Sequence, residues 1–285
     1  MGMIVTMSVA HRRFVLTALL ATAAAIACVA ILLATGPARS TAAVRRRAEA
    51  KPTIVLVHGA WADASSWDGV ITRLQADGYT VVAPANPLRS LLGDAAYVRS
   101  VIASIKGPVV LVGHSYGGAV ITNAATGAPN VKALVFIDAF VPAAGETVLA
   151  LAAKDPGSEL PTAITEVPYS DGGAGKGVDV YIKPDRFRAV FAADVPAREA
   201  DLMAVTQRPV TLAALTQPSG APAWRRIPSW YLVGLQDKAI PPATQEFMAA
   251  RAHAHTVKID ASHASLVSHP GAVAHLILTA ARATG

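Results

Sequence analysis

The chain has 285 residues, of which 53% are hydrophobic and 15% are charged, so it is long and apolar enough to bury a sizeable core. Its formal net charge of +6 comes from the first 51 residues, which contain seven Lys and Arg and one Glu and leave eighteen basic and eighteen acidic residues in the remainder. This balance gives no electrostatic case for nucleic-acid binding.

The first fifty residues have the pattern of an export leader. Arg12 and Arg13 precede an uncharged apolar run at residues 14–35, and small residues follow at 40–43. A charged start, an apolar centre and a small-residue exit describe a secretory signal, and paired arginines suit the twin-arginine type. The run is also long enough to span a bilayer as an uncleaved anchor. We therefore expect an exported protein that is periplasmic, secreted or membrane-anchored, with membrane contact only through this segment.

From residue 51 onward, short apolar runs alternate with segments of helical spacing. The first half predicts strands at residues 53–57, 80–83, 109–112 and 131–137 and helices at 65–75, 93–105 and 117–125. Continuous apolar strands separated by helices predict a parallel sheet that is covered on both faces.

The third predicted strand leads into the most informative stretch, Gly-His-Ser-Tyr-Gly-Gly at residues 113–118. A serine at such a strand-to-helix corner has a strained backbone conformation, which is tolerated because the residues two positions before and after it, Gly113 and Gly117, are glycines. Its hydroxyl lies at the helix N-terminus, where backbone N–H groups favour developing negative charge. The order of strand, G-x-S-x-G and helix is typical of a nucleophile elbow. We predict that Ser115 is a nucleophile, and the alternative is a tight structural turn.

The regular alternation stops between about residues 141 and 228. This segment contains many prolines, no clear strand, and a glycine-rich run at 171–177 whose composition predicts a mobile loop. Short amphipathic pieces occupy residues 186–193 and 197–206. We predict a helical cap inserted into a single domain of residues 51–285. Alternation then resumes with predicted strands at 229–235 and 256–259 and predicted helices at 242–252 and 270–281.

A serine hydroxyl needs a base within hydrogen-bond reach and a carboxylate that orients this base. His263 follows the last predicted strand, and the carboxyl ends of parallel strands are where ligand-facing residues gather. Asp237 follows the preceding strand and is the predicted acid, because the next strand and loop bring His263 beside it. Asp138, at the end of the strand at 131–137, is the alternative acid. The order Ser, acid, His accompanies this kind of fold.

Acyl attack also requires two donors for the oxyanion. The residue after the nucleophile, Tyr116, supplies one backbone N–H. The second is expected from the loop after the first strand, with Ala60 as the preferred donor and Trp61 as the next. Gly59 permits the close backbone approach that this loop needs.

Other reactive side chains are given structural roles. His58 and His114 are expected to brace the turns in which they lie. Cys28, the only cysteine, falls in the leader, so a thiol nucleophile is excluded from the folded part. No spacing groups the histidines with carboxylates, which argues against a metal site.

Three motifs together resemble those of α/β-hydrolases: residues 55–61, residues 111–118, and the loops that carry Asp237 and His263. Over about residues 52–283, the chain is similar to small bacterial hydrolases related to plant methyl-ester esterases and hydroxynitrile lyases. The resemblance implies an α/β-hydrolase fold with about six mostly parallel strands, no cofactor, and a small ester as substrate. Asp138 departs from the family pattern, in which a small residue often stands at this position.

We therefore expect a serine carboxylesterase in which Ser115 attacks, His263 shuttles the proton and Asp237 orients the imidazole. Two alternatives stay open: a ligand-binding protein without turnover, and a lyase or cofactor-free haloperoxidase-like enzyme on the same scaffold. Cyanohydrin cleavage needs a charged group in the cap, for which the candidates are Lys176, Lys183 and Arg186. The aromatic candidates for a substrate pocket are Tyr169, Phe187, Phe191 and Trp224.

Overall fold

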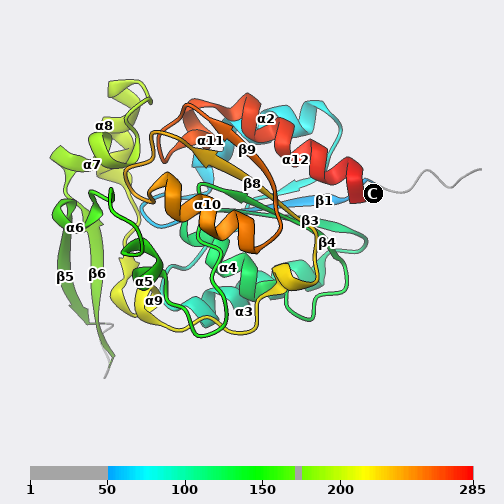
Figure 1. The fold of residues 1–285 in the computed structure, drawn as a ribbon, viewed down its shortest axis with the longest axis horizontal. Helices are drawn as coiled ribbons and strands as arrows, with labels where there is room; N and C mark the ends of the chain where they lie inside the picture. Colours follow the sequence, from blue (N-terminus) through cyan, green and yellow to red (C-terminus); the bar gives the residue numbers. More distant parts are fainter. Residues whose placement is uncertain (1–50, 171–174, 285) are drawn as a thin grey trace, which may run out of the picture. The chain divides into compact units, whose positions relative to one another are not determined.

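A computed structural model describes residues 51–170 and 175–284 (Figure 1). The predicted export leader lies outside the described residues, as do residues 171–174 of the glycine-rich run. Within the described ranges, every helix is too short or too polar to cross a membrane.

Six strands form the central sheet, in the order β2-β1-β3-β4-β8-β9, and every neighbouring pair is parallel. Their bounds are Thr53–Val57 (β1), Val81–Val82 (β2), Val109–His114 (β3), Val131–Ile137 (β4), Ser229–Gly234 (β8) and His255–Ile259 (β9). The predicted α/β class with a six-stranded parallel sheet is confirmed. The chain turns outward from β1 to β2 and then continues on the other side with β3. Loops after β1 and β3 therefore border a crevice, which is where α/β sheets bind ligands.

Helices cover both faces of this sheet (Figure 1). One face carries η1 (Ala64–Trp67), α2 (Asp68–Ala76), α11 (Ser265–Ser268) and α12 (Pro270–Thr284), and the other carries α3 (Leu91–Ser104), α4 (Tyr116–Ala124) and α10 (Pro242–Arg251). Ile54 and Leu56 of β1 pack toward the first layer, and Val55 and Val57 pack toward the second. Burial on both sides explains why the strands read as continuous apolar runs.

The cap between β4 and β8 corrects one prediction. It holds the expected helices but also a three-stranded antiparallel sheet, β5-β6-β7. The bounds are Val148–Ala152 (α5), Leu160–Ala163 (α6), Ile164–Ser170 (β5), Lys176–Ile182 (β6), Pro184–Phe191 (α7), Ala197–Thr206 (α8), Val210–Thr211 (β7), Leu212–Thr216 (α9) and Ala223–Arg225 (η2). The absence of a clear strand was wrong because β5 is mostly exposed and contains a proline, so it shows no apolar alternation.

Part of the predicted mobile loop also belongs to this sheet. Ser170 pairs with Lys176, and Tyr169 pairs with Gly177. A Cβ at Gly177 would lie 2.6 Å from the Tyr169 hydroxyl, so the tyrosine ring occupies the space that a side chain there would need. Gly177 is therefore part of the hairpin of β5 and β6 and not of a mobile loop.

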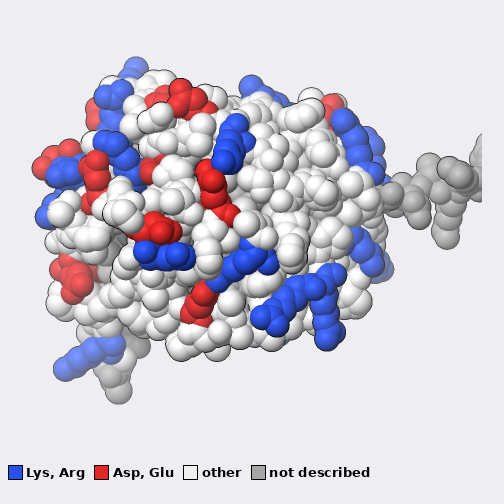
Figure 2. Space-filling model, in the orientation of Figure 1, with Lys and Arg blue, Asp and Glu red and all other residues white. Residues whose placement is uncertain are grey.

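Ion pairs join the cap to the sheet domain. Glu146 of the cap pairs with Arg251 of α10 at 2.5 Å, and Glu159 pairs with Lys238, in the loop after β8, at 2.9 Å. On the face shown in Figure 2, acidic and basic side chains lie next to one another on the cap side, and most of the surface is uncharged. The first pair is half-buried and the second is exposed, and exposed pairs contribute little to stability.

Candidate active site

Ser115 lies at the corner between β3 and α4, with φ +52° and ψ −124°. This left-handed backbone is strained for a residue with a side chain, and the corner is held by a 3.1 Å bond from its N–H to the Ile137 carbonyl. Glycine is required on both sides. A Cβ at Gly113 would lie 2.6 Å from the Gly117 carbonyl oxygen, and a Cβ at Gly117 would lie 2.4 Å from the Val57 carbonyl oxygen. The corner predicted from the sequence is present, and its glycines let the strand ends meet.

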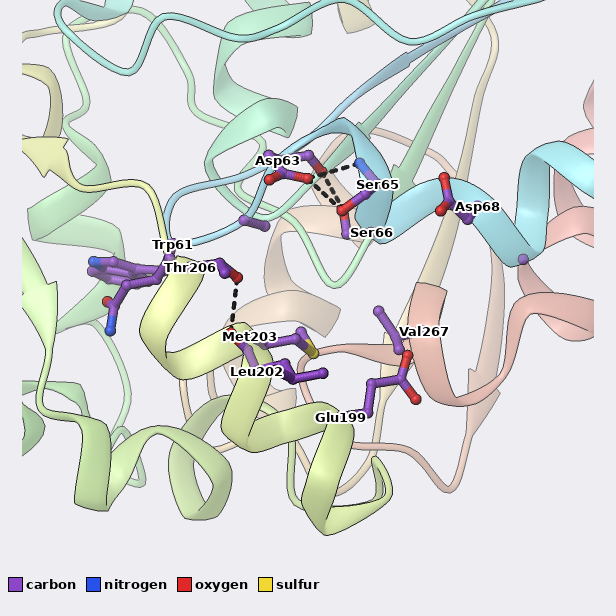
Figure 3. A pocket seen from close by; sticks show the side chains of 13 residues that line it. Trp61, Asp63, Ser65, Ser66, Asp68, Glu199, Leu202, Met203, Thr206 and Val267 are labelled. Carbon is purple, nitrogen blue, oxygen red and sulfur yellow. Dashed lines mark hydrogen bonds between the residues drawn. The ribbon is translucent and has the colours of Figure 1, made fainter.

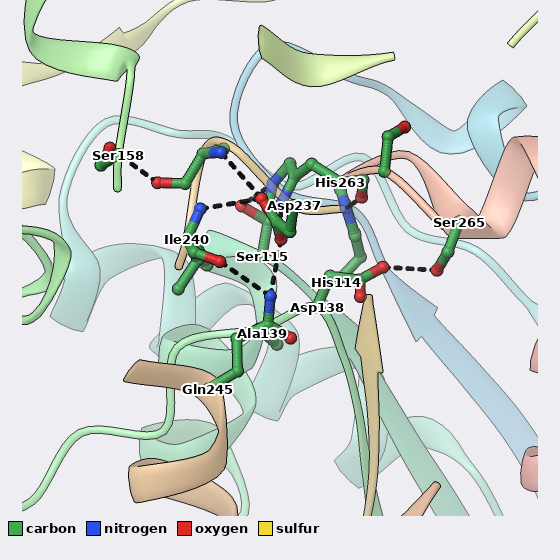
Figure 4. A network of polar contacts seen from close by, with 12 residues as sticks. His114, Ser115, Asp138, Ala139, Ser158, Asp237, Ile240, Gln245, His263 and Ser265 are labelled. Carbon is green, nitrogen blue, oxygen red and sulfur yellow. Dashed lines mark hydrogen bonds and ion pairs between the residues drawn. The ribbon is translucent and has the colours of Figure 1, made fainter. Parts of the chain in front are cut away.

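The three side chains predicted to act together meet at this corner (Figure 4). The Ser115 hydroxyl lies 2.8 Å from Nε2 of His263, and Nδ1 of His263 lies 2.7 Å from Oδ2 of Asp237. They come from the ends of β3, β9 and β8, and all three are buried. The structure therefore places an alcohol, an imidazole and a carboxylate in one hydrogen-bonded line.

Asp237 is held by three further N–H donors. Its Oδ1 accepts from the backbone of Ala239 at 2.8 Å and of Ile240 at 2.9 Å. Its Oδ2 accepts from Nε2 of Gln245 at 2.7 Å. Asp237 is thus both a turn-forming acid and the partner of His263. Gln245, a buried residue of α10, was missed, because nothing in a sequence marks one helical glutamine as facing a carboxylate.

Burial sets the protonation of this pair. It raises the pKa of Asp237 above its ordinary value and lowers the pKa of His263 to about 3. The three N–H donors around Asp237 oppose the effect of burial and favour its ionised form, which accepts a hydrogen bond from an Nδ1–H of His263. Nε2 is then free to accept the proton of Ser115, as a general base must.

Asp138, the alternative acid, takes a different place. It is fully buried at the end of β4 with φ +44°, and its Oδ2 accepts a hydrogen bond from the Ser265 hydroxyl. Burial, and next the charge of Asp237, raise the pKa of Asp138 well above its ordinary value. Among the hydrogen bonds of the described residues, none joins Asp138 to His263.

The structure also distinguishes among the backbone N–H groups that were predicted to stabilise an oxyanion. The N–H of Trp61 donates to the Arg208 carbonyl at 2.9 Å and is therefore already used. The N–H of Tyr116 belongs to the first residue of α4, where no acceptor exists within the helix. Ala60 and Tyr116 both line the cavity that contains Ser115. Ala60 and Tyr116 therefore stay the predicted donors to a substrate oxygen, and Trp61 does not.

His58 and His114 brace the surrounding turns. Nδ1 of His58 donates to the Gly59 carbonyl at 2.9 Å, and its Nε2 accepts the Asn86 N–H at 3.0 Å. Burial lowers the pKa of His58 to about 4, so it stays neutral. Nε2 of His114 donates to the backbone carbonyl of His263 at 2.9 Å, which helps to hold the loop that carries His263. Asn86 was not predicted from the sequence.

Ser115 opens into an apolar cavity of about 230 Å³, called here the Ser115 cavity. Much of its wall comes from the cap, through Val148, Ala152, Leu160 and Ile164. No charged side chain of the described residues lines it. The aromatic candidates do not line it either. Phe191 instead packs against the His263 ring, with centroids 4.9 Å apart.

The cationic candidates of the cap also lie away from this cavity. Nζ of Lys183 donates to the Thr162 carbonyl at 3.1 Å, and Arg186 pairs with Glu159 at 3.1 Å. Lys176 is exposed at the start of β6. No lysine or arginine within the described ranges therefore faces Ser115 across the cavity.

A second cavity, of about 340 Å³, lies between the start of α2 and α8 (Figure 3). Its polar wall includes Asp63, Asp68 and Glu199, and Ser115 is not among its lining residues. Trp61 is the one residue that lines both cavities. The two spaces are distinct, and only the Ser115 cavity reaches the reactive hydroxyl.

Known proteins that are similar to this chain include esterases. The model of the alpha/beta hydrolase family matches residues 54–276, which include all three hydrogen-bonded side chains. A pyrethroid hydrolase of Sphingobium wenxiniae is 30% identical over 243 residues, 79% of this chain and 85% of that protein. Methylesterase 17 of Arabidopsis thaliana is 24% identical, over 82% of this chain and 93% of that protein. The crystal structure of a pyrethroid hydrolase from Sphingobium faniae aligns with a TM-score of 0.67 at 26% identity, covering 81% of this chain and 98% of that chain.

Proposed function

Because the chain belongs to the α/β-hydrolase family, we propose that it is a serine hydrolase of small, uncharged carboxylic esters. The observation that carries this function is the line from Ser115 through His263 to Asp237 at the floor of an apolar cavity. Relatives named pyrethroid hydrolase and methylesterase support ester hydrolysis as the reaction.

In the proposed reaction, Oγ of Ser115 attacks the ester carbonyl while Nε2 of His263 takes the hydroxyl proton. The negative charge that develops on the carbonyl oxygen is met by the N–H groups of Ala60 and Tyr116. His263, stabilised as a cation by Asp237, then gives the proton to the departing alcohol. Water, deprotonated by the same imidazole, cleaves the acyl-enzyme and releases the carboxylic acid.

The walls of the Ser115 cavity determine which esters fit. A neutral hydrocarbon or aryl group buries apolar surface there, which favours binding by about 25 cal/mol per Å². A carboxylate or ammonium group finds no partner among the lining residues, and burying such a charge costs several kcal/mol. The cavity therefore supports neutral substrates and disfavours charged ones.

A pair of methyl esters tests this specificity. Because methanol is a small leaving group, the acyl chain has to occupy the cavity. We expect kcat/KM for methyl valerate to exceed that for monomethyl glutarate, which differs by a terminal carboxylate, by about 100-fold or more, since each 1.4 kcal/mol is tenfold. Released acid is measured in a pH-stat. Equal kcat/KM values for the two esters would show that the cavity does not hold the acyl chain.

The residues at positions 11–43 support a further proposal, that the protein is exported. We expect the full chain, expressed in a bacterium with a twin-arginine pathway, to leave the cytoplasm. Replacing both Arg12 and Arg13 by lysine is expected to retain it there. Cell fractionation and N-terminal sequencing of the recovered protein measure both results. Recovery of the unaltered chain only from the cytoplasm would contradict export.

A further inference from the structure

One carboxylate of the cap holds the loop that carries His263. Asp194 lies between α7 and α8, and its Oδ2 accepts from the backbone N–H of Ser262 at 3.1 Å and from the Ser268 hydroxyl at 2.9 Å. Its Oδ1 accepts from the Ser262 hydroxyl. Nδ1 of His269 lies 3.4 Å from the same carboxylate. Asp194 thus contacts Ser262, which precedes the imidazole residue, Ser268, which is the last residue of α11, and His269, which follows it.

The cap also touches the imidazole itself. The ring of Phe191, the last residue of α7, meets the ring of His263 edge-on, with centroids 4.9 Å apart and planes 70° from parallel. Phe191 is fully buried. A segment of four cap residues, 191–194, therefore fixes both a face of the imidazole and the backbone that precedes it.

The sheet domain holds the residues on both sides of Ser262. On the N-terminal side, the backbone N–H of Gln236 donates to the Ala261 carbonyl at 3.0 Å, and Nε2 of Gln236 donates to Oδ1 of Asp260 at 2.9 Å. His114 donates to the carbonyl of His263, and Asp138 accepts from the Ser265 hydroxyl. For Ser262, both the N–H and the hydroxyl go to Asp194. Ser262, the residue just before the imidazole, is thus held from the cap, while its neighbours in the loop are held from the sheet domain.

Asp194 is suited to this role by its charge. Partial burial opposes ionisation, but the hydrogen bonds from Ser262 and Ser268 outweigh it, and the pKa of Asp194 is lowered overall. An ionised carboxylate is the stronger acceptor for each of these donors. Its side chain keeps 29% of its surface exposed, so the charge is not stranded in the core.

We propose that Asp194 is a positioning residue, through which the cap holds His263 in line with Ser115. This inference rests on the proposed function and deepens it: the cap helps to align the base as well as forming much of the wall of the Ser115 cavity. Asp194 touches neither the Ser115 cavity nor the reacting atoms, so it acts on the rate of chemistry through Ser262 and not on substrate binding.

The test compares Asp194→Asn and Asp194→Ala with Asp201→Asn. Asp201 is an exposed acid of α8 in the same cap, and its side chain makes no hydrogen bond or ion pair to another described residue. We expect the Asp194 variants to lose about 10- to 100-fold in kcat with KM changed by less than about 3-fold, because small displacements of a catalytic group cost this much. The control variant is expected to stay within about 2-fold of the parent, as surface substitutions usually do.

A merely structural role is separated by counting active sites. Complete labelling with a fluorophosphonate gives the fraction of molecules with a reactive serine, and kcat is expressed per labelled site. Unchanged kcat per labelled site, with fewer sites or a lower melting temperature, would overturn the positioning role. If Asp194→Ala does not fold, Ser268→Ala, which removes one contact, is expected to give a smaller loss in the same direction.

The same experiment distinguishes this inference from the proposed function. If the parent protein neither hydrolyses neutral esters nor reacts with the fluorophosphonate, the proposed function fails. If the parent does both and the Asp194 variants keep the parental kcat per site, only the positioning role fails.

Discussion

Ser115→Ala is expected to lower kcat on a short-chain p-nitrophenyl ester by about 10⁶-fold, the loss found when the nucleophile of a serine hydrolase is removed. The reason is geometric. Among the described residues, this hydroxyl is the one that lies 2.8 Å from Nε2 of His263, and it lines the same cavity as Ala60 and Tyr116. Without it, no acyl-enzyme forms, and the remaining groups act only weakly on water.

A second serine in the same cavity provides the matched control. Ser158 lines the Ser115 cavity but donates its hydroxyl to the Ala239 carbonyl at 2.9 Å, away from the imidazole. We expect Ser158→Ala to stay within about 10-fold of the parent, since the loss of one hydrogen bond is worth about 1 kcal/mol. Circular dichroism and thermal unfolding of both variants check that each is folded. Full turnover by folded Ser115→Ala would refute the mechanism.

Asp237→Asn is expected to lower kcat by about 10⁴-fold, because the amide favours the wrong tautomer of the imidazole. The carboxylate is surrounded by donors: two backbone N–H groups, the Gln245 amide and Nδ1 of His263. Whichever way the new amide turns, its NH₂ group faces some of these donors. Steady-state kinetics on the same p-nitrophenyl ester measure the loss.

Asp138→Asn is the matched comparison, because both acids are fully buried at neighbouring strand ends. Asp138 accepts a hydrogen bond from the Ser265 hydroxyl and makes none to His263, so its amide variant keeps an acceptor for that hydroxyl. We expect it to lose much less kcat than Asp237→Asn. The opposite order, in folded proteins, would make Asp138 the partner of the imidazole.

The elements of the sheet follow from the sequence because their signal is local. The strands at 53–57 and 131–137 have the predicted bounds, since each is a run of apolar side chains buried on both faces. The helix at 197–206 also has its predicted bounds. The hairpin of β5 and β6 could not be predicted in this way, because its strands pair with each other while most of β5 stays in solvent.

The reactive groups of the site could be predicted from the sequence, whereas the residues that hold them in place could not. Ser115 and His263 stand in motifs with a fixed relation to strand ends. Gln245, Asn86 and Asp194 are single polar residues, and Asp194 meets its partner Ser262 from 68 positions away. No periodicity or spacing encodes such a contact, since it exists only once the cap is folded back onto the sheet.

The side chain of Trp61 lies where it can affect the size of the substrates that reach Ser115. Its backbone N–H is bonded to Arg208 and its ring nitrogen to the Val180 carbonyl at 2.8 Å, so the ring is tethered to the cap at two points. It forms part of the wall of both cavities. Because Trp61 lines the Ser115 cavity, its side chain is expected to limit the size of the esters that fit beside Ser115. A smaller residue at this position is expected to admit larger esters while the reacting groups stay the same.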